Sequence, residues 1–258
     1  MKKNLFLSGL AVCLLLTLVS CLGESSNVST FTSVGIVRFN EKTGRLAIES
    51  PDCSPYYFTP QNTNLADFSI DDCVRFLCTV DLSSAENSAD SLEKRKSYMG
   101  TLSNIEHVNR YEWSGYMTDT TKLLPNEQKI AYAFEEGGYL FLSGTMFLLS
   151  DITMLTDQRN DWILYSDIEA EPETDKNTSY NIYSFFLRST IKLEGIKPEK
   201  NLAILNAYKI DYIWDRIQSR EKADSKKAFI MRFNYIKDIK SDSIPVWAQQ
   251  DLTVEKAQ

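Results

Sequence analysis

Ala228-Phe-Ile-Met-Arg-Phe-Asn-Tyr-Ile236 is the stretch that decides the fold. Aromatic or apolar side chains occupy alternate positions in it: Phe229, Met231, Phe233 and Tyr235. The polar Arg232 and Asn234 lie between them. Because successive side chains of a strand point to opposite faces, this period of two predicts a β-strand with one buried face.

Similar stripes precede it in the second half of the chain. One comprises Tyr183, Phe185, Leu187 and Ile191, and another comprises Leu202, Ile204, Tyr208, Ile210, Tyr212 and Trp214. Residues 139–149 are apolar on both faces, as in a central strand, and a Gly-Gly turn precedes them. Residues 216–227 are charged and are predicted to form a hairpin loop. No long helical period is evident, so residues 111–258 are predicted to form an antiparallel, immunoglobulin-like β-sandwich.

The first half is also β-rich, but its strands are shorter. Five runs separated by turns are predicted as strands, at residues 33–40, 45–50, 56–58, 72–80 and 97–108. In the fourth run Val74, Phe76, Cys78 and Val80 share one face. Five strands in so short a segment favour a small barrel of the OB type over residues 31–110. The expected fold class is therefore all-β.

Composition excludes some classes of partner. The 258 residues are 43% apolar and 24% charged, and the formal net charge is −7. An acidic chain without a long basic run lacks the clustered positive charge that nucleic acids require. We therefore expect no nucleic-acid partner.

The N-terminus predicts a location. Two lysines precede an apolar run of about fifteen residues, which is shorter than the roughly 20 that span a bilayer and is typical of a secretory signal. Its end, Leu18-Val-Ser-Cys21, resembles a bacterial lipobox. We expect residues 1–20 to be removed, Cys21 to carry the lipid anchor and residues 21–30 to form a tether. A lipoprotein at the outer membrane, facing the periplasm or the cell surface, is predicted.

Three further cysteines remain in the exported part, Cys53, Cys73 and Cys78. In an oxidising compartment they allow at most one disulfide. Cys73 and Cys78 lie an odd number of residues apart in a predicted strand, so they point to opposite faces and are poor partners. A Cys53–Cys73 bridge and three buried free thiols both stay open.

No catalytic, metal or cofactor site is predicted. The single histidine, His107, has no nucleophile motif, zinc motif or phosphate loop around it. Five carboxylates alternate through residues 167–175, but Pro172 stands where a calcium loop of the EF-hand type needs glycine. We therefore interpret this run as a solvated acidic loop, and the protein is not expected to be an enzyme.

Aromatic side chains are the remaining candidates for ligand binding. Trp113 and Tyr116 lie near the predicted boundary, Trp162 and Tyr165 precede the acidic loop, and Trp247 lies near the C-terminus. Exposed aromatic rings bind sugars and peptides, whereas in β-domains such rings are more often part of the core. The sequence does not decide between these roles.

The layout resembles that of the NigD-like lipoproteins of Gram-negative anaerobes. The similar segments are residues 18–21, 33–37, 71–80, 139–142 and 228–236. The resemblance implies an OB-like domain followed by a β-sandwich, and it transfers no site residue except Cys21. The expected role is non-enzymatic binding of a protein partner or a glycan. A carboxylate-dependent hydrolase of the envelope and a subunit of a surface fibre remain as alternatives.

Overall fold

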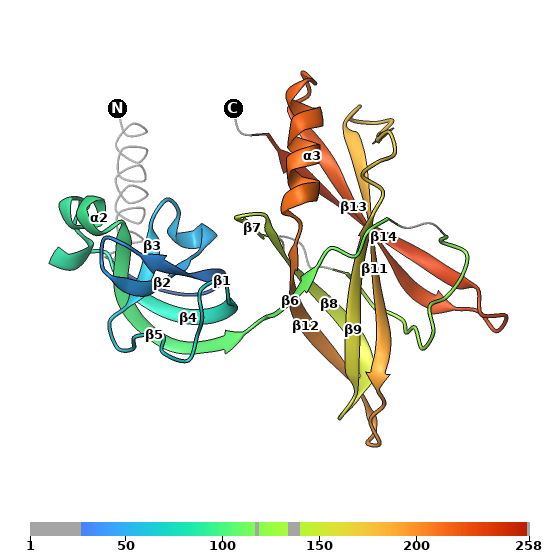
Figure 1. Ribbon diagram of the computed structural model, residues 1–258, viewed down its shortest axis with the longest axis horizontal. Helices are drawn as coiled ribbons and strands as arrows, with labels where there is room; N and C mark the ends of the chain where they lie inside the picture. The colour runs from blue at the N-terminus through green and yellow to red at the C-terminus, as the bar shows by residue number, and fades with distance from the viewer. Residues whose placement is uncertain (1–26, 117–118, 134–139, 257–258) are drawn as a thin grey trace, which may run out of the picture.

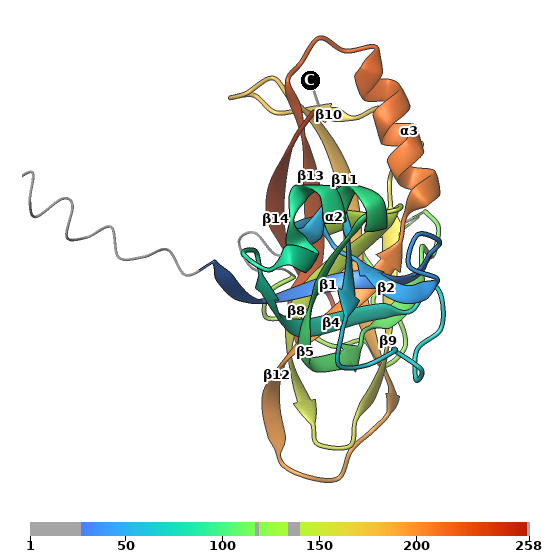
Figure 2. The same cartoon turned by 90° about the vertical axis from the view of Figure 1, so that its left-hand side faces the viewer.

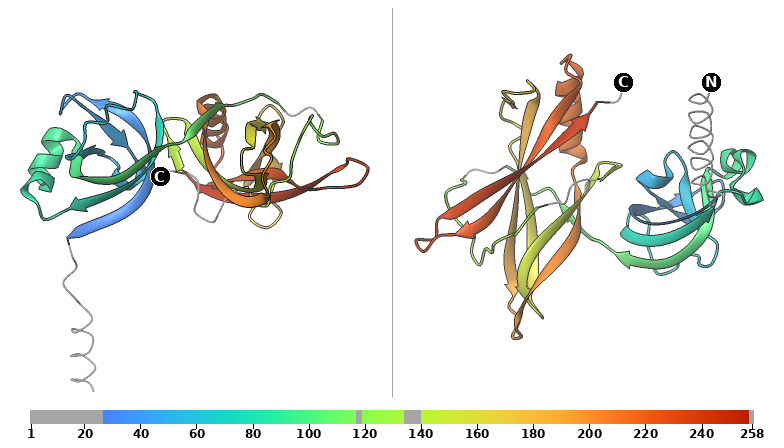
Figure 3. Two further views of the ribbon diagram at one scale, coloured as in Figure 1. Left: turned by 90° about the horizontal axis from the view of Figure 1, so that it is seen from below. Right: turned by 180° about the vertical axis from the view of Figure 1, so that it is seen from behind.

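The computed structural model describes residues 27–116, 119–133 and 140–256. The predicted signal peptide, residues 1–20, and Cys21 lie outside this part of the chain. The described residues form two β-bodies that lie side by side, and the chain passes from the first to the second at Val108 (Figure 1 and Figure 3). The fold is all-β, as the sequence predicts.

The first body is a closed five-stranded barrel with the strand order β1-β2-β3-β5-β4. Its strands are β1 (Val28–Asn40), β2 (Arg45–Glu49), β3 (Tyr57–Pro60), β4 (Cys73–Asp81) and β5 (Ser97–His107). Neighbours are antiparallel except β3 and β5, which are parallel. Three short helices lie in the connections, η1 (Pro51–Cys53), η2 (Ala85–Asn87) and α2 (Ala89–Arg95). The predicted OB-like barrel is confirmed.

The barrel core explains the stripe in β4. Its four predicted inward side chains, from Val74 to Val80, are all buried in one cluster, together with Phe58 and Ile48. Strand β1 coils closely over β2 at Gly35, where an added Cβ would lie 2.4 Å from the carbonyl oxygen of Glu49. Glycine is therefore required there because any side chain would collide with β2, and not because the backbone has a positive φ.

The predicted tether is too long by three residues. Val28, the first residue of β1, pairs with Asp81 of β4, and the N–H of Leu82 donates to the carbonyl oxygen of Asn27 at 2.7 Å. Pairing with β4 satisfies the backbone groups of this polar segment, so it becomes strand although its side chains are exposed.

The second body contains two sheets, as predicted for a sandwich. One has the order β6-β12-β8-β7, formed by β6 (Asn109–Glu112), β7 (Leu140–Leu142), β8 (Thr145–Leu155) and β12 (Glu199–Lys209). The other contains β9 (Arg159–Ser166), β10 (Glu173–Thr174), β11 (Asn181–Leu193), β13 (Ala228–Ile239) and β14 (Pro245–Glu255). The expected antiparallel pairing is corrected in two places, because β11 with β13 and β6 with β12 are parallel pairs.

A helix replaces part of a predicted strand and loop. α3 (Asp211–Lys222) follows β12 directly and lies along one end of the sandwich (Figure 1). Its buried side chains, Ile213, Ile217 and Glu221, recur every four residues. That spacing places them on one face of a helix. The predicted strand therefore ends at Lys209, and residues 216–227 are not a hairpin loop.

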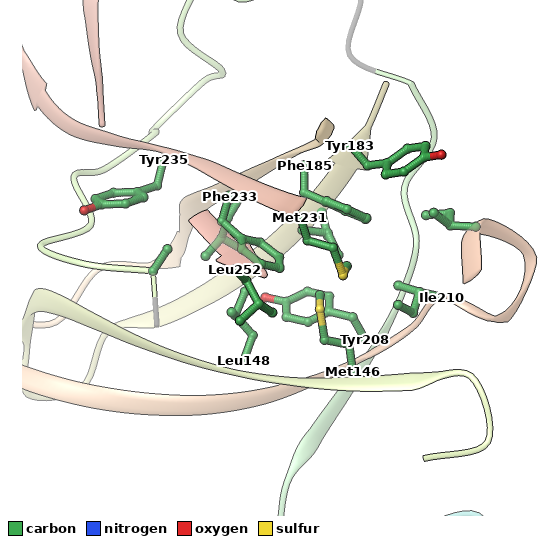
Figure 4. Close-up of a cluster of buried hydrophobic side chains, with 14 of the residues drawn as sticks. Met146, Leu148, Tyr183, Phe185, Tyr208, Ile210, Met231, Phe233, Tyr235 and Leu252 are labelled. Carbon is green, nitrogen blue, oxygen red and sulfur yellow. The ribbon is translucent and has the colours of Figure 1, made fainter. Parts of the chain in front are cut away.

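The core of the sandwich lies between the two sheets (Figure 4). Phe185 of β11 stacks on Phe233 of β13 with ring centroids 5.4 Å apart. Met146, Leu148 and Tyr208 contribute from the facing sheet. The period-two stripes predicted in β11 and β13 thus provide one wall of this core.

The barrel packs against the outer face of the β6-β12-β8-β7 sheet, and Figure 2 shows it in front of the sandwich. A buried apolar cluster joins the two bodies, comprising Val34, Ile36, Cys73, Val108, Leu142, Phe147 and Ala207. The hydroxyl of Ser143 also donates to the carboxylate of Glu49 at 3.0 Å. The two bodies therefore share a small apolar contact with a polar bond at its edge.

Candidate functional site

An aromatic patch lies on the sandwich where α3 begins. It consists of the rings of Trp113, Tyr116 and Tyr212 together with Glu169 and Arg216. Two of its rings are open to solvent, since Tyr116 is 41% exposed and Tyr212 is 49% exposed. We call these five residues the aromatic patch.

Three segments position the patch. Residues 113–116 continue β6 beside β9, where the N–H of Ser114 donates to the carbonyl oxygen of Leu164 at 3.0 Å and Tyr116 bridges to Ser166. Tyr212 and Arg216 lie one helical turn apart in α3, so they share a face. Glu169 comes from the loop that follows β9.

The rings form a supported platform. Trp113 packs against the sandwich core, and Tyr212 stacks on it with centroids 5.7 Å apart and planes inclined by 23°. Tyr116 meets Trp113 edge to face, with centroids 5.2 Å apart and an angle of 78°. Such offset and T-shaped arrangements are those that aromatic quadrupoles favour.

Glu169 ties the platform together. Its Oε1 accepts the hydroxyl of Tyr116 at 2.9 Å and that of Tyr212 at 3.4 Å, and its Oε2 accepts from Nη2 of Arg216 at 3.0 Å. The hydrogen bond from Tyr116 is the largest cause that lowers the pKa of Glu169. Desolvation, followed by the bond to Glu169, raises the pKa of Tyr116 to about 12. At neutral pH Tyr116 is therefore a neutral phenol that donates to the carboxylate of Glu169.

The other sequence candidates do not offer open rings of this kind. Trp162 is 4% exposed and belongs to the sandwich core. Trp247 is covered, because the guanidinium of Arg188 lies 5.7 Å from its ring centroid and Phe186 meets it edge to face. Its indole N–H donates to the carbonyl oxygen of Thr120 at 2.9 Å. Tyr165 is half-buried.

The acidic run disperses among different partners. Glu169 joins the aromatic patch, Glu173 lies 3.7 Å from Arg232, and Asp175 accepts from the N–H of Thr178 within its own turn at 2.7 Å. In the described ranges no group of three or more histidine, cysteine, aspartate or glutamate side chains is arranged to hold a metal ion. Glu169, Glu173 and Asp175 thus each make a local contact within the protein.

His107 lies at the end of β5 with an exposed side chain. It stacks on Phe68 with centroids 4.4 Å apart, and its Nδ1 lies 3.8 Å from Asp72. The three described cysteines are free and buried. Burial raises the pKa of the Cys73 thiol to about 11 and those of Cys53 and Cys78 to about 12, so all three are protonated at neutral pH.

The sequence identified two of the five patch residues, Trp113 and Tyr116. It missed Tyr212 and Arg216 because α3 was predicted as strand and loop, and it missed Glu169 because the acidic run was interpreted as solvated. The spacing of Ile213, Ile217 and Glu221 is the signal that could have revealed the helix. Among the described residues no helix is long and apolar enough to span a bilayer.

Residues 25–105 match a family model described as a lipoprotein OB domain. The barrel is therefore similar to the OB domain of lipoproteins, and the resemblance to lipoproteins that begin with such a domain is confirmed at this level. A search of curated proteins finds no match to the chain.

Several solved structures are similar over most of the chain. An uncharacterized protein from Parabacteroides merdae is 24% identical, with a TM-score of 0.74 over 87% of this chain and 98% of that one. A protein from Bacteroides fragilis, provisionally assigned as a lipoprotein, is 13% identical, with a TM-score of 0.58 over 88% and 98%. At these identities the likeness establishes the shared two-body fold.

A NigD-like immunity protein from Bacteroides caccae is also similar. It is 8% identical, with a TM-score of 0.46 over 85% of this chain and 91% of that one. That score is too low to support a conclusion about this chain.

Proposed function

We propose that this protein is a lipid-anchored, non-enzymatic binding protein of the outer membrane, and that it captures a glycan on the aromatic patch. The open and supported rings of Tyr116 and Tyr212 carry the proposal. The lipoprotein type of the OB domain supports an envelope role.

The aromatic patch has the chemistry that sugars require. A sugar ring presents an apolar face to an aromatic ring and hydroxyl groups to a polar rim. Glu169 and Arg216 provide an acceptor and donors beside the rings, and each is nearly half exposed. Because Glu169 already fixes both tyrosines, a ligand would meet a preorganised surface and little side-chain order would be lost on binding.

The anchor rests on the lipobox at residues 18–21. Two or three acyl chains on Cys21 would hold the protein at a membrane stably, whereas a single chain binds only marginally. A Cys21→Ala variant should therefore be recovered as uncleaved precursor or as soluble protein. If that variant still fractionates as an acylated membrane protein, Cys21 is not the anchor.

A glycan array tests the ligand class. The protein purified from membranes in mild detergent should bind a subset of glycans in a dose-dependent manner, and Tyr212→Ala should weaken the signal strongly. Tyr56→Ala, which removes a tyrosine hydrogen-bonded to a glutamate on the barrel, serves as the matched control and should retain it. No binding across the array would reject the glycan and favour a protein partner, which co-purification from solubilised membranes would then identify.

A further inference from the structure

A cavity lies at the end of the sandwich opposite α3. It is bounded by the end of β8, the end of β11, the start of β12 and the end of β13 (Figure 1). Its volume is about 610 Å³. Small-molecule sites in proteins occupy roughly 300–1,000 Å³, so the cavity has the size of a ligand site.

A rigid amide cluster forms its polar wall. The side-chain NH₂ of Gln158 donates to Oε1 of Gln128 at 2.7 Å and to Oδ1 of Asn160 at 3.0 Å. The NH₂ of Gln128 donates to the same Oδ1 at 2.7 Å and to the hydroxyl of Ser189 at 3.0 Å. Gln158 is 8% exposed and Ser189 is fully buried. Each amide is therefore fixed before a ligand arrives.

The turn between β11 and β12 presses against this wall. A Cβ added to Gly195 would lie 2.8 Å from the backbone nitrogen of Asp157 and 2.9 Å from that of Gln158. The two turns therefore pack backbone against backbone beside the amide cluster. This contact holds the cavity's shape at the end of the sandwich.

Charges of both signs line the cavity, and Lys237 and Glu199 belong to different sheets. Lys237 and Lys129 line it from β13 and the segment before β7, whereas Glu194 and Glu199 line it from the β11–β12 side. Lys129 pairs with Asp238 at 3.1 Å. Within the described part of the chain, the side chains of Lys237, Glu194 and Glu199 make no hydrogen bond or ion pair, and the opposite charge that acts on Lys237 is that of Asp238 beside it. One cation and two carboxylates are thus available to a ligand.

Apolar side chains complete the lining, and none of the lining residues is aromatic. Ile191, Leu155 and Ile239 provide an apolar surface beside the charged side chains. The absence of aromatic rings among these residues distinguishes the cavity from the aromatic patch and makes it poorly suited to stacking a sugar. A ligand that matches it has a positive end, a negative end and an apolar middle.

We propose that this cavity binds a short peptide with free ends, about two or three residues long and with apolar side chains. Its carboxylate faces Lys237, its ammonium group faces Glu194 and Glu199, and its amide bond meets the Gln128–Gln158 wall. This site is separate from the aromatic patch and goes beyond glycan capture.

Calorimetric titration of the protein in detergent with leucyl-leucine tests this proposal. N-acetyl-leucyl-leucine amide, which lacks both end charges, should bind at least tenfold more weakly. Lys237→Met and Glu199→Gln should each weaken the binding of leucyl-leucine by about tenfold. Lys240→Met, an exposed lysine of the same hairpin outside the cavity lining, is the matched control and should change nothing.

Two results would overturn the proposal: no binding of leucyl-leucine at millimolar concentration, or equal binding of the free and blocked peptides. Binding unaffected by both Lys237→Met and Glu199→Gln would also reject the cavity as the site. Tyr212→Ala should leave peptide binding intact, because that side chain belongs to the aromatic patch. Peptide and glycan binding can therefore fail independently.

Discussion

Two tyrosine–glutamate clusters on this molecule have similar components but different exposure of the rings. In the aromatic patch, Glu169 accepts from Tyr116 and pairs with Arg216. On the barrel, Glu93 accepts from Tyr56 at 2.5 Å and pairs with Lys96, and Tyr98 meets Tyr56 edge to face. We call Tyr56, Glu93, Lys96 and Tyr98 the barrel cluster.

The difference lies in where the cation sits. Lys96 lies 5.9 Å from the ring centroid of Tyr56, so its ammonium group occupies a face of that ring. The guanidinium of Arg216 pairs with Glu169 as Lys96 pairs with Glu93, but no cation–π contact to Tyr116 or Tyr212 exists among the described residues. Similar side chains thus build a partly closed surface on the barrel, where Lys96 lies over Tyr56, and an open one on the sandwich.

The largest expected effect comes from removing both open rings. A Tyr116→Ala, Tyr212→Ala double variant should lose at least about a hundredfold in glycan affinity, because interface aromatic residues commonly carry more than 2 kcal/mol each. The corresponding Tyr56→Ala, Tyr98→Ala variant should bind within about twofold of the natural chain. Surface plasmon resonance with the strongest array glycan measures both, and equal losses would remove the distinction between the clusters.

The next effect concerns the support beneath the rings. Trp113→Ala should destabilise the sandwich by about 2–4 kcal/mol, because it deletes a large ring packed on the core. Trp113→Phe should cost less, since the buried indole N–H has no hydrogen-bond partner among the described residues and its loss leaves nothing unpaired. Chemical denaturation measures both changes. A Phe variant as unstable as the Ala variant would contradict this account of Trp113.

A smaller effect is expected from the carboxylate. Glu169→Gln should weaken glycan binding by about three- to tenfold, because the bond from Tyr116 becomes a neutral one and the ion pair with Arg216 is lost. The folded-state pKa of Glu169 is lowered from 4.5. The order that the ionised carboxylate of Glu169 imposes on the aromatic patch is therefore complete above pH 4.5. It is lost as the pH falls through the lower folded-state pKa.

A titration of binding from pH 7 to pH 3 checks this sign. Affinity of the natural chain should hold down to about pH 4.5 and then fall, whereas Glu169→Gln should lack that transition. If the variant shows the same acid transition, the carboxylate of Glu169 does not order the patch.

The smallest effect tests the closed surface. Lys96→Asn removes the cation over Tyr56 and keeps a residue type that tolerates the positive φ of 53° at this position. The melting temperature should change by no more than about 2 °C, because exposed ion pairs contribute little. Weak glycan binding at the barrel cluster should appear, as line broadening of the Tyr56 ring in NMR spectra. If the Tyr56 resonances do not broaden when glycan is added, an uncovered ring alone is not sufficient for glycan binding.

Sequence patterns predicted the strands whose side chains alternate cleanly. β4 and β13 were recognisable because one face of each is buried, and burial requires apolar side chains at every second position. The parallel pairing of β11 with β13 was not predictable, because a stripe specifies a face and not a partner. α3 was missed because Tyr212 and Trp214 prolong the period of β12.

The aromatic patch was predictable only in part for a related reason. Trp113 and Tyr116 lie close together in the sequence, so this aromatic pair is recognisable without the fold. Glu169 and Tyr212 reach them from distant segments that the turn after β9 and the start of α3 bring together. The cover over Tyr56 and Trp247 likewise depends on tertiary contacts, so no sequence pattern distinguishes open rings from covered ones.

The most direct test of the central claim compares one tyrosine from each cluster. Isothermal calorimetry with the strongest array glycan should show that Tyr212→Ala weakens binding at least about tenfold. In the same titration, Tyr56→Ala should match the natural chain. Retained affinity in Tyr212→Ala, or a comparable loss in Tyr56→Ala, would contradict the assignment of the aromatic patch as the binding site.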